Sequence, residues 1–132
     1  MNKYFYTTQS TKRSLKMIHG KVAIGSSGAP TLNAAASSGV LSISRTSAGL
    51  YAVTLAGQAP GFVGFQCTVL DSNTTSITHF QVTAEALSTA GTFSFLCLAP
   101  QDSSTTTATA TDPASGAVLY FTVLFSNSSL DQ

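Results

Sequence analysis

Apolar and polar residues alternate with a period of two through most of this chain, and this pattern restricts the fold more than any other feature. Leu41 and Ile43 alternate with serines, and Phe93, Phe95 and Cys97 share one parity of a later run. Successive side chains of a β-strand point to opposite faces of a sheet, so the pattern predicts half-buried strands. The 3.6-residue period of an amphipathic helix is almost absent. The sequence therefore predicts an all-β fold.

Clusters of Gly, Pro, Asn and Ser separate the alternating runs and divide the chain into seven or eight expected strands. The predicted strands cover residues 16–24, 40–45, 50–55, 62–70, 75–87, 92–99 and 117–126, with loops expected at 31–38 and 101–112. The short Gly-containing link at 47–49 predicts a hairpin of 40–45 with 50–55. The run 117–126 is apolar on both parities, which predicts a central strand covered on both faces.

The length of 132 residues suits one domain. Several short strands with frequent turns are typical of a single β-sandwich or a jelly-roll-like domain. We place this domain at residues 17–132. Residues 1–16 have no sustained period and are predicted to form an extended N-terminal arm.

Charge divides the chain in the same way. Only 8% of the residues are charged, compared with roughly 25% in an average soluble domain. Residues 1–21 contain five basic residues and no acid, a charge of +5, whereas residues 22–132 contain Arg45 against five acids, a charge of −4. A body with so few charges has little electrostatic protection against association. We therefore expect neighbouring molecules to cover much of its surface.

The arm combines its basic residues with an aromatic triplet. Basic and aromatic residues together can bind an acidic protein surface, with the rings in pockets, or nucleic acid, through phosphate contacts and stacking. A solvated basic tail is the third interpretation. The candidate partner-binding residues are Lys3, Tyr4, Phe5, Tyr6, Lys12, Arg13 and Lys16.

The histidines and cysteines do not suggest a metal centre. Two His and two Cys are present, and no pair has the spacing of metal ligands. Cys67 and Cys97 lie in strand-like runs between large apolar residues and are predicted to be buried free thiols. His79 is expected to be a half-exposed strand residue. We expect no metal and no cofactor.

Catalytic patterns are also not evident. Asp112 precedes Pro113, where Asp commonly starts a turn through a bond from its side chain to the backbone. Glu85 is the single Glu. The Gly-Ser-Ser-Gly stretch at 25–28 has neither the spacing of a nucleophile elbow nor the Lys of a P-loop. The sequence therefore predicts a protein that is not an enzyme and has no small-molecule substrate.

The N-terminal residues contain no apolar run of the length found in secretory signals, and no stretch is long enough for a membrane span. We therefore expect neither export by the Sec route nor a membrane partner.

From about residue 18 to the end, the chain resembles small structural proteins of tailed bacteriophage virions. The resemblance is carried by Gly20-Lys21-Val22 before the Gly-Ala-Pro-Thr-Leu stretch at 28–32, by the run Arg-Thr-Ser-Ala-Gly-Leu-Tyr-Ala-Val-Thr-Leu at 45–55, and by Thr-Asp-Pro-Ala-Ser-Gly at 111–116 before the last apolar strand and Ser-Asn-Ser-Ser-Leu at 126–130. Proteins of this group include capsid decoration (cement) proteins and head-fibre bases, and the resemblance implies no catalytic residues.

The expected function follows from this resemblance and from the basic arm. We expect a non-enzymatic virion protein that decorates the capsid, binds the major capsid protein or other virion proteins through its arm, and self-associates as a homotrimer. The first alternative is a tail or head-fibre adaptor or a module that binds host glycans. The second alternative is a virion protein that binds nucleic acid with the same arm.

Overall fold

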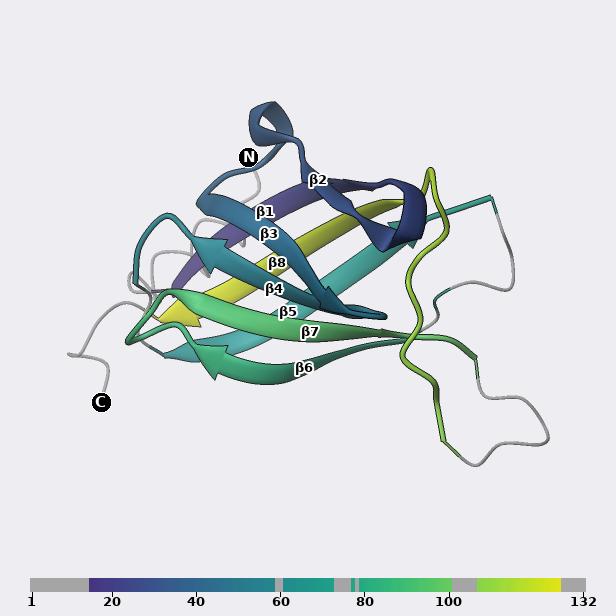
Figure 1. Ribbon diagram of the computed structural model, residues 1–132. Helices are drawn as coiled ribbons and strands as arrows, with labels where there is room; N and C mark the ends of the chain where they lie inside the picture. The colour runs from purple at the N-terminus through teal and green to yellow at the C-terminus, as the bar shows by residue number, and fades with distance from the viewer. Residues whose placement is uncertain (1–14, 59–60, 73–76, 78, 101–106, 127–132) are drawn as a thin grey trace, which may run out of the picture.

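The computed structural model describes residues 15–58, 61–72, 77, 79–100 and 107–126 (Figure 1). These residues form two four-stranded antiparallel sheets that face each other. Sheet 1 has the order β2-β1-β8-β5 and contains β1 (Leu15–Ile24), β2 (Pro30–Leu32), β5 (Phe62–Leu70) and β8 (Val118–Ser126). Sheet 2 has the order β3-β4-β7-β6 and contains β3 (Val40–Ser47), β4 (Leu50–Leu55), β6 (His79–Ala86) and β7 (Thr92–Leu98). The predicted all-β sandwich is confirmed.

The strands occur where the alternating pattern predicts them. The bounds of β4 and β5 equal the predicted ones, and β3 pairs with β4 in the predicted hairpin. The short strand β2 and the 3₁₀ turn at Ala34–Ala36 lie in a segment that was predicted to be a loop. This part of the prediction is wrong because three residues are too few to show a period of two. Pairing with β1, which sets Leu32 opposite Val22, makes the segment a strand.

The core lies between the sheets and is rich in phenylalanine. Phe93 and Phe95 of β7 face Phe121 of β8 and Phe65 of β5 across the sandwich, with ring centroids 5.0 Å apart for Phe65 and Phe95 and 6.2 Å apart for Phe93 and Phe121. Phe93, Phe95 and Phe121 are at most 2% exposed. Full burial of such a side chain contributes roughly 1.5–3 kcal/mol to folding. These rings therefore hold the two sheets together.

Strand β8 differs in one respect from the prediction. It is central in sheet 1, between β1 and β5, as predicted. Its outward parity, however, includes Tyr120, which is 40% exposed. The prediction that both faces of this strand are covered is therefore wrong for the single chain, because the outer face of sheet 1 carries no second layer among the described residues.

The sandwich has two ends, called the closed end and the open end, and each is defined by the strands that begin or finish there. At the closed end, β1 finishes at Ile24, β4 begins at Leu50 and β8 begins at Val118. At the open end, β1 begins at Leu15 and β4 finishes at Leu55. The helical segments of the described residues are 3₁₀ turns of three residues, and none of them is long or apolar enough to cross a membrane.

Candidate interaction site

The first strand places one predicted partner-binding residue at the open end. Lys16 lies in β1, which begins at Leu15, in agreement with the predicted strand 16–24; it was also counted among the arm residues 1–16. It pairs with Phe125 of β8, and its side chain is exposed. The other predicted residues lie outside the described part of the chain; they are Lys3, Tyr4, Phe5, Tyr6, Lys12 and Arg13.

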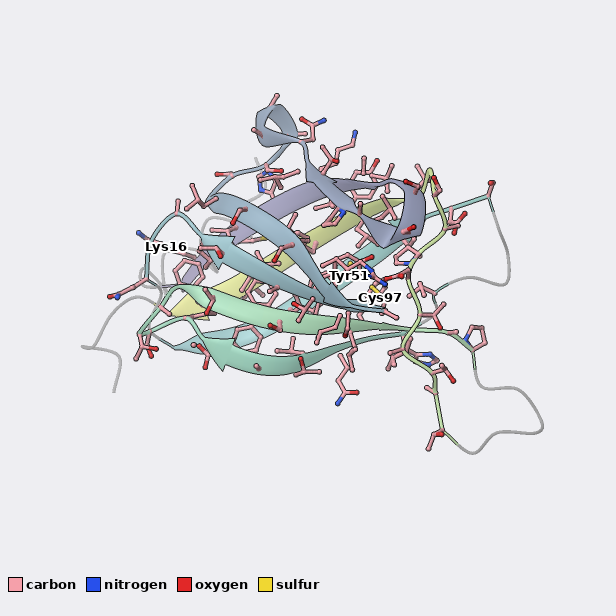
Figure 2. All side chains as sticks on the ribbon, in the orientation of Figure 1. Lys16, Tyr51 and Cys97 are labelled. Atoms are coloured by element: carbon pink, nitrogen blue, oxygen red, sulfur yellow. The ribbon has the colours of Figure 1, made fainter. Side chains whose placement is uncertain are left out.

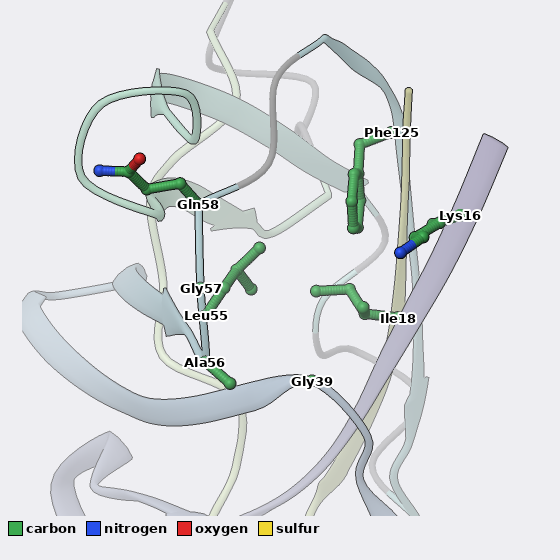
Figure 3. A pocket seen from close by; sticks show the side chains of 8 residues that line it. All are labelled: Lys16, Ile18, Gly39, Leu55, Ala56, Gly57, Gln58 and Phe125. Carbon is green, nitrogen blue, oxygen red and sulfur yellow. The ribbon is translucent and has the colours of Figure 1, made fainter. Parts of the chain in front are cut away.

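A pocket of about 190 Å³ opens beside Lys16 (Figure 3). Its walls are formed by residues from the beginning of β1, the end of β4 and the end of β8. Its lining residues are Lys16, Ile18, Gly39, Leu55, Ala56, Gly57, Gln58 and Phe125. The pocket therefore lies next to the point where the N-terminal residues enter the sandwich.

The outer face of sheet 1 is the second feature that could contact a partner. On this face Lys21 of β1, Tyr120 of β8 and Thr68 of β5 form one cross-strand row. Met17 of β1 is 63% exposed and Leu70 of β5 is 61% exposed. The Lys21 ammonium lies 5.5 Å from the centroid of the Tyr120 ring, within the range of a cation–π contact. The face combines large exposed apolar side chains with a positive charge.

A polar cluster around Asp112 joins three segments at the closed end. The Asp112 carboxylate accepts two hydrogen bonds from Arg45, from Nε at 2.9 Å and from Nη2 at 2.7 Å. It also accepts a 2.8 Å bond from the backbone N–H of Gly49. A two-pronged contact between Arg and a carboxylate fixes the geometry as well as adding stability. The predicted role of Asp112 in starting a local turn is therefore replaced by one in which it ties the β3–β4 hairpin to the segment before β8.

Tyr51 extends this cluster into the core. Its ring is fully buried, and its hydroxyl donates a 2.9 Å hydrogen bond to the carbonyl of Gly28. The hydroxyl also lies 3.4 Å from Asp112 Oδ1. Gly28 has a φ of +73°, and a Cβ there would lie 2.4 Å from Cγ of Asp112. The closed end is thus packed so tightly that glycine is required at this position.

The charges of the cluster shift the pKa values of its members in the directions that the contacts predict. The hydrogen bonds from Arg45 hold the pKa of Asp112 below its ordinary value, and the Gly49 N–H adds to this effect. The Asp112 contact raises the pKa of Arg45. Burial, followed by the nearby Asp112 charge, raises the pKa of Tyr51. Each group therefore keeps its charge state around neutral pH, which suits a structural contact better than proton transfer.

The cysteines are free thiols, as predicted, with Cys97 buried and Cys67 half-buried. Burial raises the pKa of Cys97 to about 12 and also raises that of Cys67. A thiol with a raised pKa is a poor nucleophile and a poor metal ligand. Within the described residues, no group of three or more His, Cys, Asp or Glu side chains could hold a metal ion.

Glu85 Oε1 accepts a 2.7 Å hydrogen bond from the backbone N–H of Leu87, so this carboxylate fixes the chain just beyond β6.

Aromatic side chains on the segment 50–70 would favour the glycan-binding alternative if they were exposed. Tyr51 is fully buried, and Phe62 and Phe65 are half-buried against the core. Part of the loop at 101–112 lies outside the described residues. The exposed tyrosine of the described residues is Tyr120, on the outer face of sheet 1.

Sequence reasoning missed both the Asp112 cluster and the pocket. Arg45 and Asp112 are 67 positions apart, and the pairing of strands that brings them together was not predicted. One signal was present: Arg45, Gly49 and Asp112 all lie in the runs that carry the resemblance. The pocket had no signal, because it is formed by the ends of strands that are distant in sequence.

The chain was compared with protein-family models, with curated proteins and with solved structures, and nothing matches it. The resemblance to virion proteins therefore rests on the sequence runs described above.

Proposed function

We propose that this protein is a non-enzymatic structural component of a tailed-bacteriophage virion and acts as a capsid decoration (cement) protein. Its N-terminal arm binds neighbouring subunits of the major capsid protein, and its body self-associates as a homotrimer. The resemblance of the chain from about residue 18 onward is the support for placing it in the virion. The support for an association role comes from the surface of the sandwich.

The observation that carries the association role is the exposed outer face of sheet 1. Large apolar side chains that remain exposed on one face are typical of interaction sites. Met17 and Leu70 are both more than 60% exposed on this face, and Tyr120 lies between their strands. The arm leads directly into β1, which belongs to the same sheet. A partner that covers this face can therefore also receive the arm.

The use of the polar side chains supports a role without chemistry. Arg45, Tyr51 and Asp112 form the main polar cluster that the structure describes, and their hydrogen bonds connect the hairpin, the turn at Gly28 and the segment before β8. These contacts hold the fold. A decoration protein needs a stable body and a contact surface, and the arm can cover a large area of a partner with few residues.

The test uses the full chain and the particles of the phage that encodes it. A variant with Lys3→Gln, Lys12→Gln and Arg13→Gln keeps the body intact and removes the charge of the arm. We expect this variant to keep the circular dichroism of the parent and to lose at least tenfold in particle binding, measured by co-sedimentation. A variant with Lys3→Arg, Lys12→Arg and Arg13→Lys keeps the charge of the arm and serves as the matched control, which should bind particles like the parent.

Three outcomes would contradict the proposal. Unchanged occupancy of particles by the arm variant would remove the arm from the contact. Electron cryo-microscopy that places the protein on the tail or a fibre would favour the adaptor alternative. Binding to DNA that weakens steeply with salt would favour the nucleic-acid alternative.

A further inference from the structure

The pocket at the open end has walls that backbone and side-chain hydrogen bonds hold in place. The Ala56 N–H donates to the Gly39 carbonyl at 2.9 Å, and the Leu55 N–H donates to the Gly91 carbonyl at 2.7 Å. Gln58 Nε2 donates to the Thr89 carbonyl at 2.7 Å. A pocket whose walls are already fixed loses little conformational entropy when it is filled. The geometry therefore describes a preformed receptor.

The chemistry of the pocket suits an aromatic side chain. Figure 3 shows the side chains of Ile18, Leu55 and Phe125 turned toward a common space, with the Lys16 ammonium at its side. Its volume of about 190 Å³ compares with roughly 150 Å³ for an apolar cavity that binds benzene. A cation near the face of an aromatic ring adds electrostatic attraction. One phenylalanine or tyrosine ring fits these conditions.

The sequence contains such rings shortly before one of the residues that line this pocket. Tyr4-Phe5-Tyr6 precedes Lys16, a lining residue, by ten positions at its nearest member. The intervening residues 7–15 include Thr and Ser but no Gly, Pro, Asn or Asp. Those missing types are the strongest turn formers, and threonine favours extended backbone. A fully extended linker of this length spans up to roughly 30 Å, so the triplet can reach a pocket on a neighbouring copy.

Charge favours a second copy of the same chain as the source of the ring. Residues 1–14 contain three basic residues and no acid, whereas residues 15–132 contain Lys16, Lys21 and Arg45 against five acids, a charge of −2. An arm of one molecule is attracted to the body of another by this difference. We propose that the pocket binds an aromatic side chain of Tyr4-Phe5-Tyr6 from a neighbouring copy, so that copies exchange arms. This inference rests on the self-association in the proposed function and adds a contact between arm and pocket to it.

The absence of tryptophan from the chain permits a clean reporter. A Phe5→Trp variant of the full chain carries one indole at the centre of the triplet. At high protein concentration we expect a blue-shifted emission and protection from acrylamide quenching. On dilution, the emission should shift to the solvent-exposed wavelength as the sedimentation coefficient falls to that of a monomer.

A second substitution is designed to fill the pocket. Gly57 lines the pocket, and a Cβ there meets no atom within 4 Å. In the Phe5→Trp background, Gly57→Leu should expose the indole and weaken self-association at least tenfold. Gly25, at the closed end, lies outside the pocket, and a Cβ there has one ordinary contact, 3.5 Å from the Ala29 carbonyl oxygen. Gly25→Leu is therefore the control, and it should leave the emission unchanged.

Three results would overturn the inference. An indole that is exposed at every concentration shows that the triplet does not dock. A buried indole whose emission is independent of concentration shows that each chain fills its own pocket. A folded Gly57→Leu protein with unchanged emission shows that the ring docks elsewhere. If Gly57→Leu does not fold, the full chain with Tyr4→Ser, Phe5→Ser and Tyr6→Ser replaces it. Self-association of this variant as strong as that of the parent overturns the inference.

Particle binding, measured in parallel, separates this inference from the proposed function. Particles that bind the parent chain while the indole remains exposed contradict arm exchange only. A concentration-dependent buried indole in a protein that binds no particles contradicts the capsid role only.

Discussion

The closed end and the open end of the sandwich are made by the same strands but by different chemistry. At the closed end, Asp112 receives hydrogen bonds from Arg45 and from the backbone of Gly49, and no space remains for a larger residue at Gly49. At the open end, a pocket of about 190 Å³ is left between strands, and an added Cβ at Gly57 meets nothing. Figure 2 shows Lys16 at one end and Tyr51 and Cys97 toward the other.

This difference separates stability from interaction within one small domain. The closed end ties three segments that are distant in sequence, so its residues are expected to determine the free energy of unfolding. At the open end, β1 begins at Leu15 and a pocket remains between the strand ends. Substitutions should therefore change stability at the closed end and association at the open end.

A pair of glycine substitutions should give the largest contrast between the two ends. Gly49 has a φ of +72°, and a Cβ there would lie 2.5 Å from the Thr111 nitrogen. Gly49→Ala should lower the free energy of unfolding by about 3 kcal/mol, because backbone strain and a clash with backbone atoms add together. Gly57→Ala should change it by about 0.5 kcal/mol or less. Urea denaturation of both variants measures the contrast, and equal effects would contradict it.

Loss of the carboxylate at the closed end should have the next largest effect. Asp112→Ala leaves the Gly49 N–H and the Arg45 guanidinium without their acceptor. We expect the free energy of unfolding to fall by about 2 kcal/mol, the range for an unsatisfied buried donor and lost charged hydrogen bonds. Asp112→Asn keeps one acceptor oxygen and should lose less. Thermal unfolding would contradict this prediction if Asp112→Ala and the parent had the same midpoint.

Acid should weaken the closed end in the same direction but by less than Asp112→Ala. The pKa of Asp112 is lower in the folded chain than its ordinary value of 3.8. The stabilisation is therefore present above the unfolded pKa and is lost as the pH falls through the folded pKa. Unfolding measured from pH 6 down to pH 2 should show this loss in the parent. The Asp112→Ala variant should show a smaller dependence in that window.

The tyrosine hydroxyl should contribute least of the three contacts. Tyr51→Phe keeps the buried ring but removes the hydrogen bond to the Gly28 carbonyl, which is 2.9 Å long. We expect a loss of about 1 kcal/mol, the typical contribution of one such bond. Denaturant midpoints measure it, with Tyr120→Phe on the exposed face of sheet 1 as the control. A loss as large as that of Asp112→Ala would show that the hydroxyl organises the whole cluster.

Most of the strands could be predicted because the side chains of a half-buried strand record its two faces. The run at 50–55 alternates so regularly that the bounds of β4 were predicted without error. The strand β2 could not be predicted, because three residues carry no period and its pairing with β1 decides its conformation. Both faces of β8 carry apolar residues, and this pattern predicted that both faces are covered. In the single chain, the face that carries Tyr120 is exposed.

The candidate site was predictable only where it depends on composition. Lys16 was identified as a basic residue, and the structure sets it at the rim of a pocket. The pattern gave no sign that Ile18, Leu55 and Phe125 were more than ordinary strand residues. They line the pocket because three strand ends meet there. The arm residues Lys3, Tyr4, Phe5 and Tyr6 remain predictions from sequence, since they lie outside the described residues.

The sequence by itself determined the secondary structure class, the separation of a basic N-terminus from a weakly acidic body, and the small number of charged residues. These properties depend on residue types and on spacing along one segment. Tertiary structure alone decided the order of strands in the sheets, the contact of Asp112 with a hairpin 67 positions away, and the pocket beside Lys16. Such features depend on distances between segments, which are set by packing of the Phe-rich core and are not recorded in any local pattern.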